Sequence, residues 1–138
     1  MRSSLPVLAL VVLAATGCSG KGVTGAGEQT SLCAAVAEYN DLAEPDQTQR
    51  GAVLAHLDAV LRILGRIDPQ QHADHRPTPP APVVALVHDE RTTYQQLRSA
   101  VATSSSTDAL ATVLASFATS TTFAAIDTGV ELWTSNNC

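Results

Sequence analysis

Apolar residues recur at steps of three and four along most of the chain between residues 30 and 135, and this spacing is what most constrains the fold. In a helix such steps place the apolar side chains on one face, whereas a half-buried strand requires strict alternation. No segment alternates convincingly, and no Asn-Gly or Asp-Gly pair joins two candidate strands. The longest apolar run predicts a helix that Asp46 caps and Pro69 stops, and its members are Val53, Leu54, Leu57, Val60, Leu61, Leu64 and Ile67.

Shorter runs of the same spacing predict the remaining helices. The first is expected over residues 30–43, and a third begins at Pro82 and ends at Ser104. The polar stretch Thr119–Thr122 divides the later apolar positions into a fourth and a fifth helix, although a single kinked helix over residues 107–135 also satisfies the spacing. We therefore expect an all-α bundle of four or five helices over residues 30–138.

The N-terminus has the pattern of an export signal. Arg2 provides a positive start, and the apolar stretch 5–15 is too short to span a hydrocarbon core of about 30 Å. It leads into Leu13-Ala14-Ala15-Thr16-Gly17-Cys18, which resembles a bacterial lipobox with Ala15 where leucine is usual. The resemblance implies that residues 1–17 are removed and that Cys18 carries a diacylglyceryl group with palmitate-type chains. An ordinary cleaved signal peptide and an uncleaved membrane helix are the alternatives.

This lipobox predicts where the protein is found. A lipidated Cys18 places the chain on the cell membrane, facing the extracytoplasmic side. The glycine-rich segment 18–29 would be a flexible tether between the anchor and the helical domain. Gly20, Gly22 and Gly25 match a dinucleotide-binding pattern, but they lack the strand and helix that this pattern requires. We therefore expect no cofactor there.

The two other cysteines, Cys33 and Cys138, lie at opposite ends of the predicted helical domain. An exported compartment permits disulfides, and with Cys18 modified by lipid these two are the only remaining pair. We expect them to join the first helix to the C-terminus, with free thiols as the alternative. The lipobox, this cysteine pair and the helix pattern together resemble small actinobacterial envelope lipoproteins that end in a cysteine. Arginine-rich usage, with Lys21 the only lysine, agrees with that resemblance.

The charge of the chain argues against some partners. Removing Arg2 with the leader leaves 7 of the 8 Lys and Arg residues against 13 Asp and Glu, a net charge near −6. An acidic surface disfavours nucleic acid and electrostatic binding to anionic lipid. We therefore expect contact with the membrane through the lipid anchor alone and no nucleic-acid partner.

Residues with metal or catalytic chemistry are few. His72 and His75 are the best metal candidates, with Asp74 between them, but they complete no recognisable zinc site. The chain has no G-x-S-x-G nucleophile motif. Asp89 and Glu90 are neighbours, and on a helix adjacent side chains point about 100° apart, so they do not converge as an acid/base pair. We expect neither a resident cofactor nor an enzyme.

Glu90 stands where the apolar stripe of the third predicted helix should continue. We expect it to be buried beside Arg91, Arg98 or a tyrosine, or else the stripe is imperfect. The function that the sequence favours is a non-enzymatic binding or structural module for another envelope component. The alternative is a carrier of a hydrophobic molecule such as haem or lipid, with candidate ligands Tyr39, Tyr94, His56 and His88.

Overall fold

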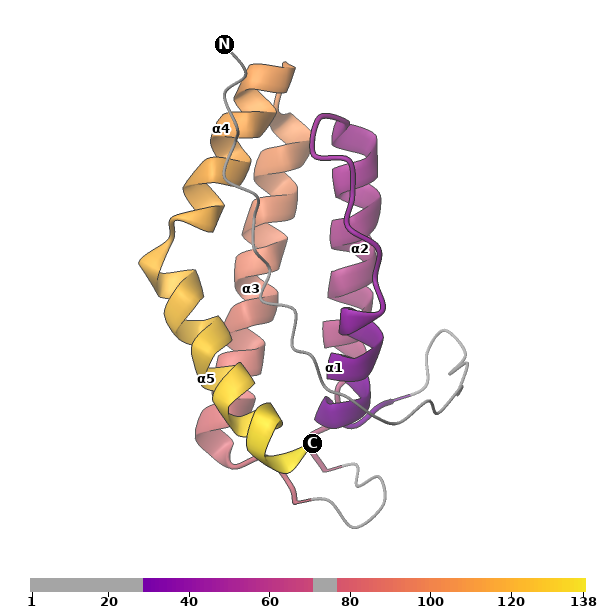
Figure 1. The fold of residues 1–138 in the computed structure, drawn as a ribbon, viewed down its shortest axis with the longest axis vertical. Coiled ribbons are helices and arrows are strands. Elements are labelled where there is room, and N and C mark those ends of the chain that lie inside the picture. The colour runs from indigo at the N-terminus through magenta and orange to yellow at the C-terminus, as the bar shows by residue number, and fades with distance from the viewer. Residues whose placement is uncertain (1–28, 71–76) are drawn as a thin grey trace.

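Five helices make up the fold in the computed structural model, which describes residues 29–70 and 77–138 (Figure 1). They are α1 (Leu32–Asn40), α2 (Arg50–Arg66), α3 (Ala81–Thr103), α4 (Thr107–Ala118) and α5 (Thr121–Asn137). The prediction of an all-α bundle is confirmed, with five helices. The leader, the lipidation site Cys18 and the histidines His72 and His75 lie outside the described residues.

The long helix α3 is the centre of the bundle. It packs against α2 on one side and α5 on the other, and α4 returns along the C-terminal part of α3 (Figure 1). The short helix α1 contacts both α2 and α5, at the end of the bundle where the chain terminates. Four helices, α1, α2, α3 and α5, therefore meet at this end, and α4 lies at the other.

Two apolar clusters fill the bundle. The larger joins α2, α3 and α4 and contains Val53, Leu57, Val60, Tyr94, Leu97, Val101, Leu110 and Leu114. The smaller joins α1, α3 and α5 and contains Leu32, Val83, Val87 and Val130. The buried positions of each helix follow the three- and four-residue steps seen in the sequence, because those steps line up one face of a helix.

A break at Thr119 and Ser120 separates α4 from α5. The Ser120 hydroxyl accepts the Phe123 N–H at 3.2 Å and so caps α5, and the two helix axes differ by 55°. This excludes the single long helix that the sequence also allowed. Among the described residues no single helix is long and apolar enough to cross a membrane. The bent pair of α4 and α5, taken together, has the length and composition of a membrane span.

The start of the second helix differs from the prediction. The Asp46 carboxylate accepts the Thr48 N–H at 2.9 Å and the Gln49 side-chain amide at 2.8 Å, so it closes a turn ahead of the helix. Helix α2 then begins at Arg50, with Gln49 at the N-cap and without a side-chain cap. An Asx turn of this kind uses the carboxylate that would otherwise cap the helix.

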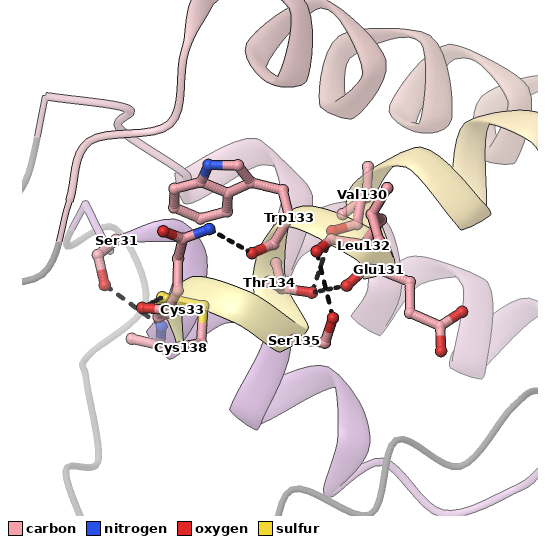
Figure 2. Close-up of a disulfide and its surroundings, with 11 residues drawn as sticks. Ser31, Cys33, Val130, Glu131, Leu132, Trp133, Thr134, Ser135 and Cys138 are labelled. Carbon is pink, nitrogen blue, oxygen red and sulfur yellow. Dashed lines mark hydrogen bonds between the residues drawn. A yellow bond between two sulfur atoms is a disulfide. The ribbon is translucent and has the colours of Figure 1, made fainter.

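Helix α1 is linked to the C-terminus by a disulfide and to the end of α2 by backbone hydrogen bonds. A disulfide joins Cys33 to Cys138, whose Cα atoms are 5.3 Å apart, and this confirms the predicted pairing (Figure 2). Ahead of α1, the Thr30 N–H donates to the Arg66 carbonyl oxygen, and the Asp68 N–H donates to that of Thr30, both at 2.9 Å. A helix of nine residues is not stable by itself in water, so these links hold α1 in place.

Candidate functional site

A cavity of about 60 Å³ lies where α1, α2, α3 and α5 meet. Its walls are mostly apolar, with Leu32 from α1, Ile63 from α2 and Val130 from α5 among them. The polar side chains that reach it are Tyr39, Asn40, Glu90, Asp127, Glu131 and Thr134. A mostly apolar cavity with a few convergent polar groups is the usual form of a small-ligand site.

Glu90 is the deepest of the acidic groups. Its position in α3 continues the steps between the buried residues Val87 and Tyr94, so the helix itself carries the carboxyl inward. Glu90 is 8% exposed. Within the described part of the chain, no hydrogen-bond donor contacts its carboxyl group. A buried carboxyl without a partner costs free energy.

Of the neighbours that the sequence offered for Glu90, the two arginines are engaged elsewhere, and a tyrosine, Tyr39, lines the same cavity. Arg98 forms an ion pair with Asp58 of α2, because it lies two turns further along α3, toward the other end of the bundle. The guanidinium of Arg91 lies against Gly65 of α2, since neighbouring side chains on a helix point in different directions. Glu90 therefore faces the cavity without a nearby cation among the residues that line it.

Burial and neighbouring charge raise the pKa of two acidic groups of the cavity, Glu90 and Asp127. Burial raises the pKa of Glu90 to about 7, and the charge of Asp127 contributes to the same shift. Burial, and then the charge of Glu131, also raise the pKa of Asp127. Sequence reasoning did not select Asp127 or Glu131. The signal was present in their four-residue spacing, which places both carboxyls on one side of α5.

Tyr39, which lines the cavity, is paired with a second buried tyrosine. The hydroxyls of Tyr39 on α1 and Tyr94 on α3 form a hydrogen bond of 2.9 Å. Burial raises the pKa of Tyr39 to about 12 and also raises that of Tyr94, so both remain neutral. The Tyr94 ring in turn packs against Phe117 and Phe123, with ring centres 5.7 and 5.5 Å away. The two tyrosines and these rings therefore form a continuous set of contacts from the cavity to the break between α4 and α5.

The last turns of α5 combine the disulfide with part of the cavity wall (Figure 2). The Thr134 hydroxyl is buried and donates back to the carbonyl oxygen of Val130 at 3.0 Å. The side chain of Glu131 extends away from the disulfide in Figure 2. Because Cys138 is bonded to α1, the wall formed by Val130, Glu131 and Thr134 is held against α1.

The histidines described by the structure lie apart from this cavity. His88 is largely exposed on α3, 3.8 Å from the carboxylate of Asp89. His56 is partly exposed on α2, with its Nδ1 3.1 Å from the Ala43 carbonyl oxygen. No set of three or more His, Cys, Asp or Glu side chains within residues 29–70 and 77–138 is arranged to hold a metal ion.

A second cavity of about 180 Å³ lies on the other side of Leu32, Leu64 and Ile67, which line both cavities. Its walls include Pro69 and Pro79, and His88 and Arg91 are its basic side chains. The same end of the bundle thus has an acidic cavity and a cavity with two basic side chains, and the three apolar residues line both.

No protein-family model, curated protein or solved structure matches this chain.

Proposed function

We propose that this chain is a lipid-anchored protein of a bacterial cell envelope that acts as a non-enzymatic binding module. The cavity between α1, α2, α3 and α5 is its binding site. One observation carries this proposal, which is that the buried carboxyl of Glu90 faces the cavity with no hydrogen-bond donor among the described residues. A bound ligand would supply a hydrogen-bond donor to this carboxyl and would offset the free-energy cost of burying it.

The lipobox and the disulfide support the location. The sequence Leu13-Ala14-Ala15-Thr16-Gly17-Cys18 resembles the site at which bacterial lipoproteins are cleaved and acylated. The Cys33–Cys138 disulfide is typical of a compartment outside the reducing cytoplasm. The glycine-rich segment 18–29 would let the helical domain reach away from the membrane surface.

We predict that Cys18→Ala releases the protein from membranes. Two acyl chains anchor a protein stably, because each buried methylene contributes about 0.8 kcal/mol, and the variant would have no thiol to modify. Cell fractionation followed by mass measurement of the mature chain tests this, with Ser19→Ala as the matched control that keeps the thiol. A Cys18→Ala protein that still sediments with membranes like the Ser19→Ala control would contradict the anchor.

Native mass spectrometry of the protein purified from its own envelope tests the binding site. We expect a non-covalent addition to the mass of the processed chain, and we expect Glu90→Gln to lack it. Glu44→Gln is the control, because Glu44 is exposed and does not line the cavity. If the wild-type spectrum shows only the mass of the chain and its acyl groups, the cavity is not a binding site.

The geometry favours this function over a carrier of haem or lipid. The two cavities hold about 60 and 180 Å³, whereas sites for larger ligands usually enclose roughly 300–1,000 Å³. The hydroxyls of Tyr39 and Tyr94 bond to each other, and His56 bonds to the backbone. A carrier role would therefore require the helices to separate and these side chains to exchange partners.

A further inference from the structure

We propose that the acidic cavity binds a small primary alkylammonium ion, with the carboxylate of Glu90 as the counter-ion of its NH₃⁺ group. This inference rests on the proposed function and specifies the chemical class of the ligand. It follows from the charge, the wall chemistry and the size of the cavity.

The charge of the cavity selects a cation. Three carboxyl groups line it, from Glu90, Asp127 and Glu131, and no lysine, arginine or histidine is among its lining residues. On the surrounding helices, Arg66 of α2 is engaged with Glu38 of α1. A cation that enters the cavity would therefore meet uncompensated negative charge, and attraction is strong where water is excluded.

The wall chemistry selects an organic cation. The lining residues from the end of α2 and its C-cap are apolar, namely Ile63, Leu64 and Ile67, and α1 contributes further apolar side chains. A metal ion requires several oxygen ligands around it, and the described residues form no such group. A primary ammonium needs fewer fixed partners, because it carries three N–H donors on a carbon stem that can lie against the apolar walls.

The donors of an ammonium also match the acceptors that are available. Glu90 has free acceptor oxygens, and the Asn40 amide and the Thr134 hydroxyl line the same cavity. The cavity volume of about 60 Å³ corresponds to roughly two water molecules at about 30 Å³ each. That space accommodates an NH₃⁺ group with its first methylenes, while the rest of an alkyl stem extends through the opening.

The protonation of Glu90 makes the binding depend on pH. The other titratable groups that line the cavity are Tyr39 from α1 and Asp127 and Glu131 from α5, while α2 contributes none. Tyr94, on the same helix as Glu90, lies close enough to feel its charge. Because the pKa of Glu90 is raised to about 7, the ionised fraction of this carboxyl rises about tenfold between pH 6 and pH 8. An alkylammonium remains charged throughout this range, so its affinity should rise by a similar factor.

The test is a titration of the full processed chain with n-butylammonium chloride at constant ionic strength, followed by amide chemical shifts. We expect shifts confined to the segments that line the cavity, which are α1, the end of α2, the middle of α3 and α5 from Asp127 onward. We also expect about tenfold tighter binding at pH 8 than at pH 6. n-Butanol, which has the same shape without the charge, should bind at least tenfold more weakly. A parallel titration with Nα-acetyl-lysine methylamide shows where the natural ammonium group comes from. If this compound binds more tightly than n-butylammonium, the ligand is a lysine side chain of a partner protein. If it binds more weakly, the ligand is a free amine.

Two variants make the result specific. Glu90→Gln should lose at least tenfold in affinity and most of the pH dependence, whereas the exposed Glu44→Gln should bind like the wild type. If Glu90→Gln does not fold, Asp127→Asn replaces it, with a smaller loss expected because Asp127 is half-buried. Equal binding of n-butanol, or unchanged binding by a folded Glu90→Gln, would overturn the inference.

The outcomes also separate this inference from the proposed function. If native mass spectrometry finds a ligand whose retention requires Glu90 while n-butylammonium does not bind, the binding module stands and the ligand class is wrong. If neither experiment finds a ligand, both proposals fail.

Discussion

Replacing both Cys33 and Cys138 by alanine should lower the free energy of unfolding by up to about 4–5 kcal/mol. The disulfide closes a loop between residues 105 positions apart, and in the chain-entropy model a crosslink of that span removes much of the freedom of the unfolded chain. Helix α1 would then be held by the backbone pairing at Thr30, by the contacts of Glu38 with Arg66 and of Tyr39 with Tyr94, and by its apolar packing. Guanidinium unfolding followed by circular dichroism measures the difference.

The matched control for this experiment is Cys18→Ala, which removes a cysteine and leaves the disulfide intact. Reduction of the wild type should reproduce the loss seen in the double variant, and should leave the double variant unchanged. A double variant with the same unfolding midpoint as the control would show that the crosslink does not stabilise the bundle. In that case the non-covalent contacts of α1 would be sufficient to hold it.

The second large effect is the pH dependence that Glu90 gives to stability. Its pKa is raised from an ordinary 4.5 to about 7 in the folded protein, so the native state binds this proton more tightly than the unfolded chain does. The stabilisation is complete below pH 4.5 and is lost as the pH rises through 7. At about 1.4 kcal/mol per pKa unit, the loss amounts to about 3 kcal/mol. Asp127, whose pKa is also raised, acts in the same direction.

Glu90→Gln should remove most of this dependence, because the amide resembles the protonated carboxyl and does not ionise. The variant is therefore expected to unfold at higher denaturant concentration than the wild type at pH 8, and at a similar concentration at pH 4. Glu44→Gln, at an exposed position, should follow the wild type at both values. A wild type whose stability falls no more than that of Glu90→Gln between pH 4 and pH 8 would refute the argument.

The helices and the disulfide could be predicted from the sequence, because the helices depend on the local spacing of apolar residues and the disulfide on the number of cysteines. Six apolar residues of α2 recur at helical steps, so most of its buried face could be predicted directly from the sequence. The cysteine pair followed from there being only two cysteines beyond Cys18. The N-cap of α2 lies three residues beyond the predicted Asp46, because the Asp46 carboxylate can accept the hydrogen bonds of a turn as well as those of a helix end.

The cavity could be predicted only in part, because it depends on which helices are neighbours. Glu90 was recognisable as an interruption of an apolar stripe, and its burial was anticipated. Its surroundings were not, since the contacts of α3 with α1 and α5 are tertiary. The sequence offered Arg98 as a partner, whereas the bundle pairs Arg98 with Asp58 and brings Asp127 toward Glu90 instead.

We infer the site from one arrangement, in which four helices line the cavity that holds Glu90, a residue only 8% exposed whose carboxyl meets no hydrogen-bond donor in the described chain. The most direct test is an NMR titration of the side-chain carboxyl carbon of Glu90 in the ligand-free protein. A midpoint near pH 7 is the result that this structure predicts. A midpoint at or below the ordinary value of 4.5 would mean that the carboxyl is solvated or hydrogen-bonded, and the proposed site would then have no basis.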